Sequence, residues 1–160
     1  MNNEIEALTF ISKAFPDAMM DSNASFGGCN QSVEEDEAFQ KFVKDHDLGE
    51  NRANLIVFGP EHFMYWYGVA IPEEVDQVPG LLKFSLPKAK VFQKEESASA
   101  VAFDLPLNFE LPKFMNEAGE LGDKFQTSMV ENLTPYILRQ LDLANKKLTK
   151  TMYLEISSEK

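Results

Sequence analysis

The run "MYWYGVAI", Met64–Ile71, sets three aromatic residues side by side in a segment whose aromatic and β-branched content predicts a β-strand. Successive side chains of a strand point to opposite faces of its sheet. Tyr65 and Tyr67 are therefore expected on one face and Trp66 on the other. Three adjacent rings cannot all face one core, so at least one of them has to contact something other than the main core.

Short matches along the chain indicate an internal repeat. Each half has a segment that ends in Asp-Leu, an apolar segment upstream of it, and a strand-like run that begins with Met-Tyr downstream. The matched pairs are Lys41–Leu48 with Tyr136–Leu143, Leu8–Ala14 with Leu82–Ala89, and Met64–Ile71 with Met152–Ser157. Each half thus reads as strand, helix, strand, and the single predicted domain divides into residues 5–72 and 81–157.

Two segments carry helical signals. Ser32–Leu48 begins with a candidate capping box, has acidic residues in its first turn, and bears an apolar stripe that includes Phe42. In the second half, Ile137 and Leu141 recur at helical spacing after Asn132–Pro135. Because proline is tolerated in a first turn, this spacing predicts a second helix that begins there.

Three further segments are predicted to be strands, and one long segment fits neither pattern. The strand candidates are Asn54–Gly59, Lys88–Glu96 and Lys150–Ser158. The segment Ser97–Gln126 contains Pro106 and Pro112, which argue against a regular helix across its centre. We interpret it as an insertion that packs on the second half, in part as a lid.

The composition restricts the class of protein. A 160-residue chain with 44% hydrophobic residues can bury a core, and no apolar run is long enough for a membrane helix. The N-terminus lacks the features of a secretory signal, so a cytoplasmic protein is expected. A net charge of −11 disfavours nucleic acid as a direct partner and attracts cations, small organic ones included.

Familiar catalytic and cofactor signatures are missing from the sequence. It has no cysteine pairs and no histidines at ligand spacing, which predicts no metal site, and no glycine-rich phosphate loop, so no cofactor is expected. The lone Cys29 could pair only with His46 or His62, neither of which lies in a motif. We interpret Cys29 as an incidental thiol.

The stretch Met64–Glu95 resembles the middle of GyrI-like domains, which are also the effector-binding domains of multidrug-responsive transcription regulators. The resemblance rests on an aromatic strand ending in Gly68-Val69, an acidic loop, a Pro-Gly pair, a strand ending in Leu86-Pro87 and a strand carrying Phe92. The final strand of the family often carries a glutamate before a β-branched residue, here Glu155-Ile156. The match depends on order and spacing over Leu8–Ile156, with the insertion unmatched.

The resemblance implies a fold and a class of ligand. GyrI-like domains are α+β, with two pseudosymmetric β-α-β-β units that form an antiparallel sheet with helices on one face and a ligand groove. The family's regulators carry a DNA-binding region ahead of the effector domain. With no room for one before Leu8, the chain resembles a stand-alone member. The departures are Ser157-Ser158 where a proline usually follows the glutamate, and the long insertion, which puts the shape of the pocket in doubt.

Aligning the halves by Met64 and Met152 matches Tyr67 with Glu155 and Tyr65 with Tyr153, all predicted on one face. A carboxylate in a half-buried strand costs several kcal/mol unless it has a partner. The resemblance implies that such a glutamate neutralises a cationic ligand and that aromatic rings stack on the ligand. The candidate ligand contacts are Glu155, Tyr67, Trp66, Tyr65, Tyr136, Tyr153 and Phe42.

Other interpretations of these residues stay open. Glu155 could face solvent on a terminal edge strand, and Trp66, Phe42 and Tyr136 could be ordinary core residues. The favoured function is binding of hydrophobic, cationic small molecules by a sensor or sequestering protein. The alternatives are a GyrI-like hydrolase, with Glu155 as general base and Tyr136 as proton donor, and an inhibitor module that binds a protein partner.

Overall fold

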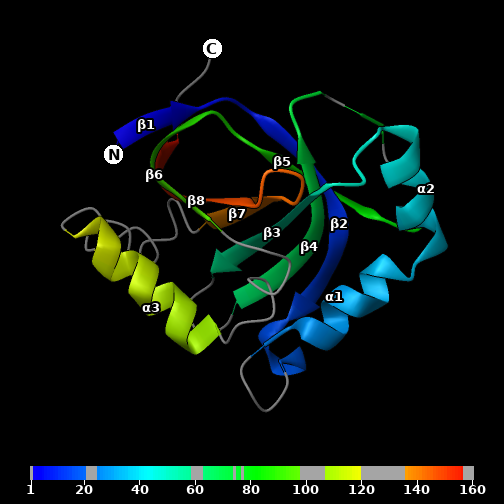
Figure 1. The fold of residues 1–160 in the computed structure, drawn as a ribbon, viewed down its shortest axis with the longest axis horizontal. Helices are drawn as coiled ribbons and strands as arrows, with labels where there is room; N and C mark the ends of the chain where they lie inside the picture. The colour runs from blue at the N-terminus through cyan, green and yellow to red at the C-terminus, as the bar shows by residue number, and fades with distance from the viewer. Residues whose placement is uncertain are drawn as a thin grey trace.

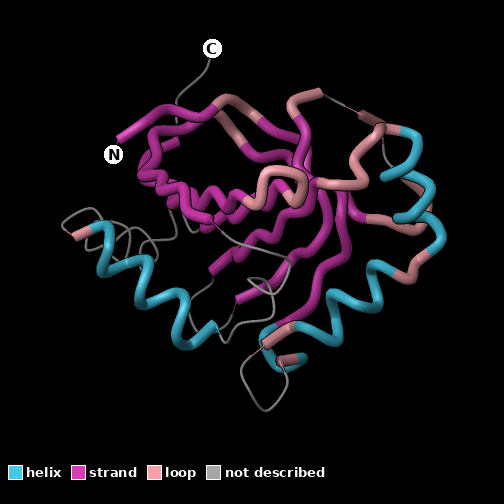
Figure 2. The backbone as a smooth tube through the Cα atoms, viewed as in Figure 1, coloured by secondary structure: helices cyan, strands magenta, loops and turns pink. Residues whose placement is uncertain are grey.

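A computed structural model of the chain describes residues 2–20, 25–58, 63–73, 75–76, 78–97, 107–119 and 136–156, with the backbone alone described at residues 2–3, 17, 58, 107–110, 115 and 154–156. Within these ranges, eight strands form one antiparallel sheet that helices flank (Figures 1 and 2). The strands are β1 (Asn2–Ile5), β2 (Leu8–Pro16), β3 (Asn51–Phe58), β4 (Phe63–Ile71), β5 (Leu82–Leu86), β6 (Ala89–Ser97), β7 (Tyr136–Asp142) and β8 (Lys147–Ile156). The helices are α1 (Gly27–Glu34), α2 (Glu37–Asp45) and α3 (Leu107–Ala118), with a 3₁₀ turn at Asp17–Met19.

The strand order has an approximate twofold symmetry. It reads β1-β6-β8-β7-β3-β4-β2-β5, so the centre lies between β7 and β3, where Ile56 pairs with Ile137. The first unit comprises β2, α1 with α2, β3 and β4, and the second comprises β6, α3, β7 and β8. The predicted α+β fold of two pseudosymmetric β-α-β-β units is confirmed. Two of the sequence matches that indicated the repeat are wrong, because Lys41–Leu48 falls mostly in α2 and Tyr136–Leu143 mostly in β7, and the mate of β2 is β6 rather than β5.

The sheet curls so strongly that one of its faces becomes an interior. Phe84 of β5 and Tyr136 of β7 lie with ring centroids 5.8 Å apart, although three strands separate β5 from β7 in the sheet. Rings from two strands so far apart in the sheet can touch only if the sheet is bent and both rings lie on its concave face. We call this the inner face; the outer face carries the helices (Figure 2).

The two faces have separate apolar cores. On the outer face, Phe26, just before α1, and Phe39 and Phe42 of α2 pack against Ile56 and Tyr65 of the sheet. On the inner face the core is built from strands, with these buried members: Phe10, Ala53, Leu55, Leu86, Ala89, Val91, Leu138 and Tyr153. Trp66 packs against this inner core, so the alternation predicted for Tyr65, Trp66 and Tyr67 is confirmed.

The predicted helix over Ser32–Leu48 is instead two helices that break after Glu34. Asp36 is the N-cap of the second helix, and its side chain accepts a hydrogen bond from the backbone N–H of Phe39 at 3.1 Å. An aspartate at this position satisfies an amide that has no partner within the helix, a contribution of about 1 kcal/mol. The capping box predicted at Ser32 is therefore wrong, because Ser32 lies inside α1.

The second predicted helix, beginning near Asn132–Pro135, is wrong where the chain is described. The segment forms β7, with Ile137 and Leu141 on the outer face and Leu138 on the inner face. Both faces of a central strand are buried here, so its apolar residues do not alternate cleanly. A short apolar run of this kind matches helical and strand spacing equally well.

The segment Ser97–Gln126, predicted to lack a regular helix, contains α3 with Pro112 inside it. A proline in a helix interior removes one backbone hydrogen bond and costs about 3 kcal/mol or more. Packing offsets this cost: Phe114 and Ala118 are buried against Phe92 and Met152 of the second unit. No helix of the described chain is long and apolar enough to cross a membrane.

Candidate binding site

The structure divides the predicted ligand contacts between the two faces of the sheet. Phe42, Tyr65 and Tyr67 lie in the outer core under α1 and α2, whereas Trp66, Tyr136 and Tyr153 lie in the inner core. The expectation that Tyr153 shares a face with Tyr65 and Tyr67 is therefore wrong. Tyr136, predicted on a helix, is the first residue of β7.

The alignment of Met64 with Met152 caused this error. Met152 is buried in the outer core under α3, while Met64 has the strand parity of Trp66, which packs on the inner core. A shift of one residue exchanges the faces of every side chain in a strand. The backbone of Glu155 pairs with Lys90 beside an irregularity in the β6–β8 register. Its side chain lies outside the described part of the chain, so its predicted role stays a prediction.

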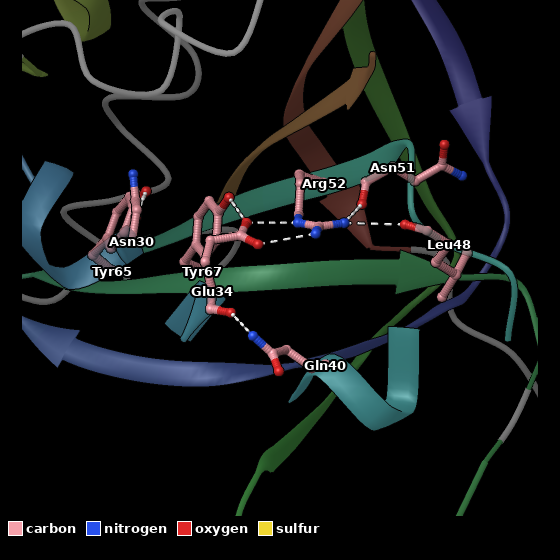
Figure 3. A network of polar contacts seen from close by, with 8 residues as sticks. All are labelled: Asn30, Glu34, Gln40, Leu48, Asn51, Arg52, Tyr65 and Tyr67. Carbon is pink, nitrogen blue, oxygen red and sulfur yellow. Dashed lines mark hydrogen bonds and ion pairs between the residues drawn. The ribbon is translucent and has the colours of Figure 1, made fainter. Parts of the chain in front are cut away.

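A different glutamate meets Tyr67. Glu34, the last residue of α1, accepts a hydrogen bond from the Tyr67 hydroxyl at 2.5 Å (Figure 3). The same carboxylate receives two parallel hydrogen bonds from Arg52 of β3, from Nε at 2.6 Å and from Nη2 at 2.9 Å. This bidentate geometry is the strong form of an arginine–carboxylate pair. One helix end is thus held by two strands.

The surroundings fix the protonation of this cluster. Burial alone would raise the pKa of Glu34, but hydrogen bonds from Arg52 and Tyr67 outweigh it and hold that pKa below its ordinary value. Burial and the neighbouring Glu34 carboxylate raise the pKa of Tyr67 well above its usual range. Glu34 is therefore an anion at neutral pH and Tyr67 a neutral donor. A carboxylate with a lowered pKa is a weak general base, so the cluster suits binding better than proton transfer.

Arg52 is held from several directions at once. Its Nη1 donates to the carbonyl oxygens of Leu48 at 3.0 Å and of Asn51 at 2.7 Å, in addition to the bonds to Glu34. Its guanidinium also lies over the ring of Phe39, 5.3 Å from the centroid. Figure 3 shows the guanidinium between Glu34 and the chain just before β3. The arrangement combines a salt bridge with a cation–π contact.

A cavity of about 340 Å³ adjoins this cluster. Its walls combine apolar surface from α2 with the charged groups of the Glu34–Arg52 pair. The lining residues are Glu34, Phe39, Gln40, Val43, Lys44, Asp47, Gly49 and Arg52. Its volume is at the lower end of the range of small-molecule sites, and it is open to solvent on one side rather than enclosed.

A second polar network ties α1 to three strands next to the first. Arg139 Nε donates to Asn54 Oδ1 at 3.0 Å, Asn54 Nδ2 lies 3.3 Å from the Tyr65 hydroxyl, and that hydroxyl donates to Asn30 Oδ1 at 2.7 Å. All four side chains are buried. Phe26 stacks on Tyr65 with centroids 4.1 Å apart. The network fixes the position of α1 on the sheet and so positions Glu34 at its end.

The inner face holds a chain of aromatic rings. Trp66, Phe84, Tyr136 and Tyr153 follow one another in edge-to-face contacts, with centroids 5.1 to 5.8 Å apart. Burial raises the pKa of both tyrosines. Among the described residues, the Trp66 Nε1 and Tyr153 hydroxyl groups have no hydrogen-bond partner. A second cavity, of about 240 Å³, has Ala53, Gln140 and Thr149 in its lining and shares Arg52 with the first.

Sequence reasoning missed Glu34 and Arg52. The pattern around Glu34 indicates only an acidic helix start, and no motif singles out Arg52. One signal was available: the arginines of the chain, Arg52 and Arg139, both stand in apolar strand-like segments, where a cation needs a partner. The sequence does not show which acid provides that partner, because Glu34 lies 18 residues from Arg52.

Known structures share the fold of this chain. The structure of SAV2435 bound to tetraphenylphosphonium matches with a TM-score of 0.56 and 10% sequence identity, covering 97% of this chain and 93% of that one. EcmrR, from an EcmrR–DNA complex, matches with a TM-score of 0.50 and 9% identity, covering 98% of this chain and 57% of that one. No protein-family model matches the sequence, and no curated protein matches it significantly. At 9–10% identity these matches show a shared fold alone, and that fold agrees with the one implied by the sequence resemblance.

Proposed function

We propose that this GyrI-like fold binds hydrophobic, cationic small molecules, as a sensor or a sequestering protein, and that Glu34 is the carboxylate that neutralises them. The observation that carries the proposal is the place of Glu34: an ionised carboxylate at the wall of a cavity that Phe39 and Val43 also line. The likeness in fold to a protein bound to tetraphenylphosphonium, itself a lipophilic cation, supports it.

The energetics of such a site are favourable for a delocalised cation. Hydrogen bonds from Arg52 and Tyr67 already offset the cost of partly burying the Glu34 charge. A ligand cation beside Glu34 would share that charge with Arg52. The ring of Phe39, which Arg52 covers in the structure, would add about 1–2 kcal/mol of cation–π energy for a cation placed over it. The net charge of −11 would raise the local concentration of cations.

The residues predicted from sequence keep a place in this proposal. Tyr67 would hold the Glu34 carboxylate in position, and Tyr65 would hold α1 through Asn30. Glu155 remains a second candidate carboxylate. Trp66, Tyr136 and Tyr153 lie in the inner core and would contact a ligand only if it entered the concave side of the sheet.

Calorimetric titration with tetraphenylphosphonium tests the proposal. We expect wild-type binding, and a loss of about tenfold in affinity in Glu34→Gln, equivalent to about 1.4 kcal/mol, because the amide keeps the shape and removes the charge. Glu155→Gln examines the second carboxylate. Asp45→Asn, at an exposed acid paired only with Lys41 in the described chain, is the matched control and should leave affinity unchanged.

Two results would contradict the assignment. Equal affinities in wild-type and Glu34→Gln proteins would remove Glu34 from the site, and a loss confined to Glu155→Gln would move the site to β8. Wild-type protein that binds neither tetraphenylphosphonium nor any flat cationic dye at millimolar concentration would refute the function itself.

A further inference from the structure

The Arg52 guanidinium occupies the position that a ligand cation would take at the proposed site. We infer that Arg52 is a built-in competitor for Glu34, and that the site recognises ligands with a planar, delocalised cation of the guanidinium or amidinium type, which displace Arg52. The inference rests on the proposed function and specifies its ligand class. It starts from the contacts of a single side chain.

Those contacts match what a planar cation requires. A guanidinium offers two parallel N–H donors in one plane and a flat face, and here both features are used: the fork engages both oxygens of Glu34, and the face lies over Phe39. The cavity begins at the same three side chains. A ligand amidinium entering from the cavity would find the same carboxylate and the same ring.

Arg52 also has hydrogen-bond partners other than Glu34. Arg52 Nη1 is already bonded to the carbonyl oxygens of Leu48 and Asn51, at 3.0 and 2.7 Å, and these do not depend on Glu34. Arg52 can therefore release Glu34 while part of its hydrogen bonding persists.

The geometry around Glu34 favours a planar cation over a compact one. Lys44 and Asp47 line the cavity with opposite charges, which largely offset each other. Tyr67 donates to Glu34 from the sheet side, which leaves the oxygens of Glu34 open to a fork from the direction of Arg52. An alkylammonium, as a strongly hydrated point charge, reproduces neither the fork nor the ring contact.

An intramolecular competitor lowers the apparent affinity of a ligand by the fraction of molecules in which it has moved away. Removing the competitor should restore the intrinsic affinity. Arg52→Ala is thus expected to bind phenylguanidinium at least about tenfold more tightly than wild-type protein, if the pair is worth about 1.4 kcal/mol. A mutation that removes a side chain from a binding site would more often weaken binding, so the direction of the change is diagnostic.

The experiment is a calorimetric titration of phenylguanidinium into wild-type, Arg52→Ala and Arg52→Ala/Glu34→Gln proteins. Tight binding to the single variant and its loss in the double variant would support the inference. Lys44→Ala is the matched control: it removes another cation from the cavity lining and should not reproduce the tenfold gain. Phenethylammonium should bind Arg52→Ala more weakly than phenylguanidinium does.

Affinity that is unchanged or lower in Arg52→Ala would overturn the inference, and so would a gain that survives in the double variant. If Arg52→Ala is too unstable to titrate at 25 °C, its thermal midpoint replaces the titration. Phenylguanidinium should then raise that midpoint by more than it raises the wild-type one, and an equal rise would refute the competition. Arg52→Gln provides a second, more conservative variant for the same comparison.

The result separates this inference from the proposed function. Wild-type protein that binds tetraphenylphosphonium through Glu34, with no gain for phenylguanidinium in Arg52→Ala, would refute the competitor alone. A gain in Arg52→Ala that requires Glu34, with no wild-type binding of any cation, would leave the competition in place and refute the function.

Discussion

The two halves of the sheet anchor their helices in the same way with different chemistry. In the first half, Glu34 at the end of α1 is held by Arg52 and Tyr67. In the second half, Glu117 near the end of α3 accepts from Lys94 at 2.7 Å and from Lys150 at 3.1 Å. A glutamate in the last turn is disfavoured by the helix dipole, so each needs donors from the strands.

The difference between the two anchors indicates different roles. Lys150 is only 2% exposed, pairs with Glu96 as well, and lies 5.1 Å from the centroid of Phe114, so it is enclosed on all sides by protein groups. Arg52 borders a cavity, and its carboxylate partner is 32% exposed. A point charge buried in this way is suited to holding α3, whereas a planar charge beside open space can be exchanged.

The largest expected effect is a loss of stability when the anchor of the second half is removed. Lys150→Ala should lower the free energy of unfolding by about 3 kcal/mol, because it removes two ion pairs at once, together with the packing of an almost fully buried side chain against Phe114. Arg52→Ala should lower it by only about 1–2 kcal/mol, since water can reach the carboxylate it leaves behind. Urea unfolding of both variants measures the difference. Equal losses would mean that the two anchors are equally structural.

The sequence predicts the fold correctly where the pattern of apolar and polar residues fits only one kind of element. The strands around Asn51–Phe58 and Phe63–Ile71 alternate or run apolar between turn residues, and both are predicted correctly from that pattern. The segment Tyr136–Asp142 is mistaken for a helix because both its faces are buried, and α3 is missed because packing of Phe114 outweighs the effect of Pro112. In both cases tertiary contacts, which local spacing does not encode, decide the structure.

The site was less predictable, for a related reason. Strand alternation alone correctly separates Tyr65 and Tyr67 from Trp66. It does not find the partner of Tyr67, because Glu34 is 33 residues away and reaches Tyr67 only through the docking of α1. The alignment of Met64 with Met152 pairs residues that lie on opposite faces of the sheet. It therefore singles out Glu155 as the counterpart of Tyr67. A contact between the end of a helix and a strand becomes visible only once the position of the helix on the sheet is known.

A pH titration of stability sharpens the comparison further. Hydrogen bonds hold the pKa of Glu34 and of Glu117 below the ordinary value, which is about 4.3, although burial opposes the shift in each case. The unfolded chain therefore binds protons at higher pH than the folded one. The stability from each pair is complete above about pH 4.3 and is lost as the pH falls through the folded pKa.

Glu34→Gln and Glu117→Gln should each lower the free energy of unfolding by about 1 kcal/mol at pH 7 and by much less at pH 3. Urea unfolding at the two pH values measures this. Glu35→Gln is the control, since this neighbour contacts Gln31 at the exposed surface and should change stability little at either pH. A loss for Glu34→Gln that is the same at pH 3 as at pH 7 would show that its charge does not stabilise the fold.

The smallest effect compares the outer face with the inner one. Tyr67→Phe removes the donor to Glu34 and should cost about 1 kcal/mol, because the carboxylate loses one of its hydrogen bonds. Tyr153→Phe removes a buried hydroxyl that has no hydrogen-bond partner among the described residues, so it should change stability by less than about 0.5 kcal/mol or raise it. Thermal unfolding of the two variants measures both changes. A loss in Tyr153→Phe as large as that in Tyr67→Phe would mean that the inner hydroxyl has a polar partner, and that the inner face is built around a polar group as the outer face is.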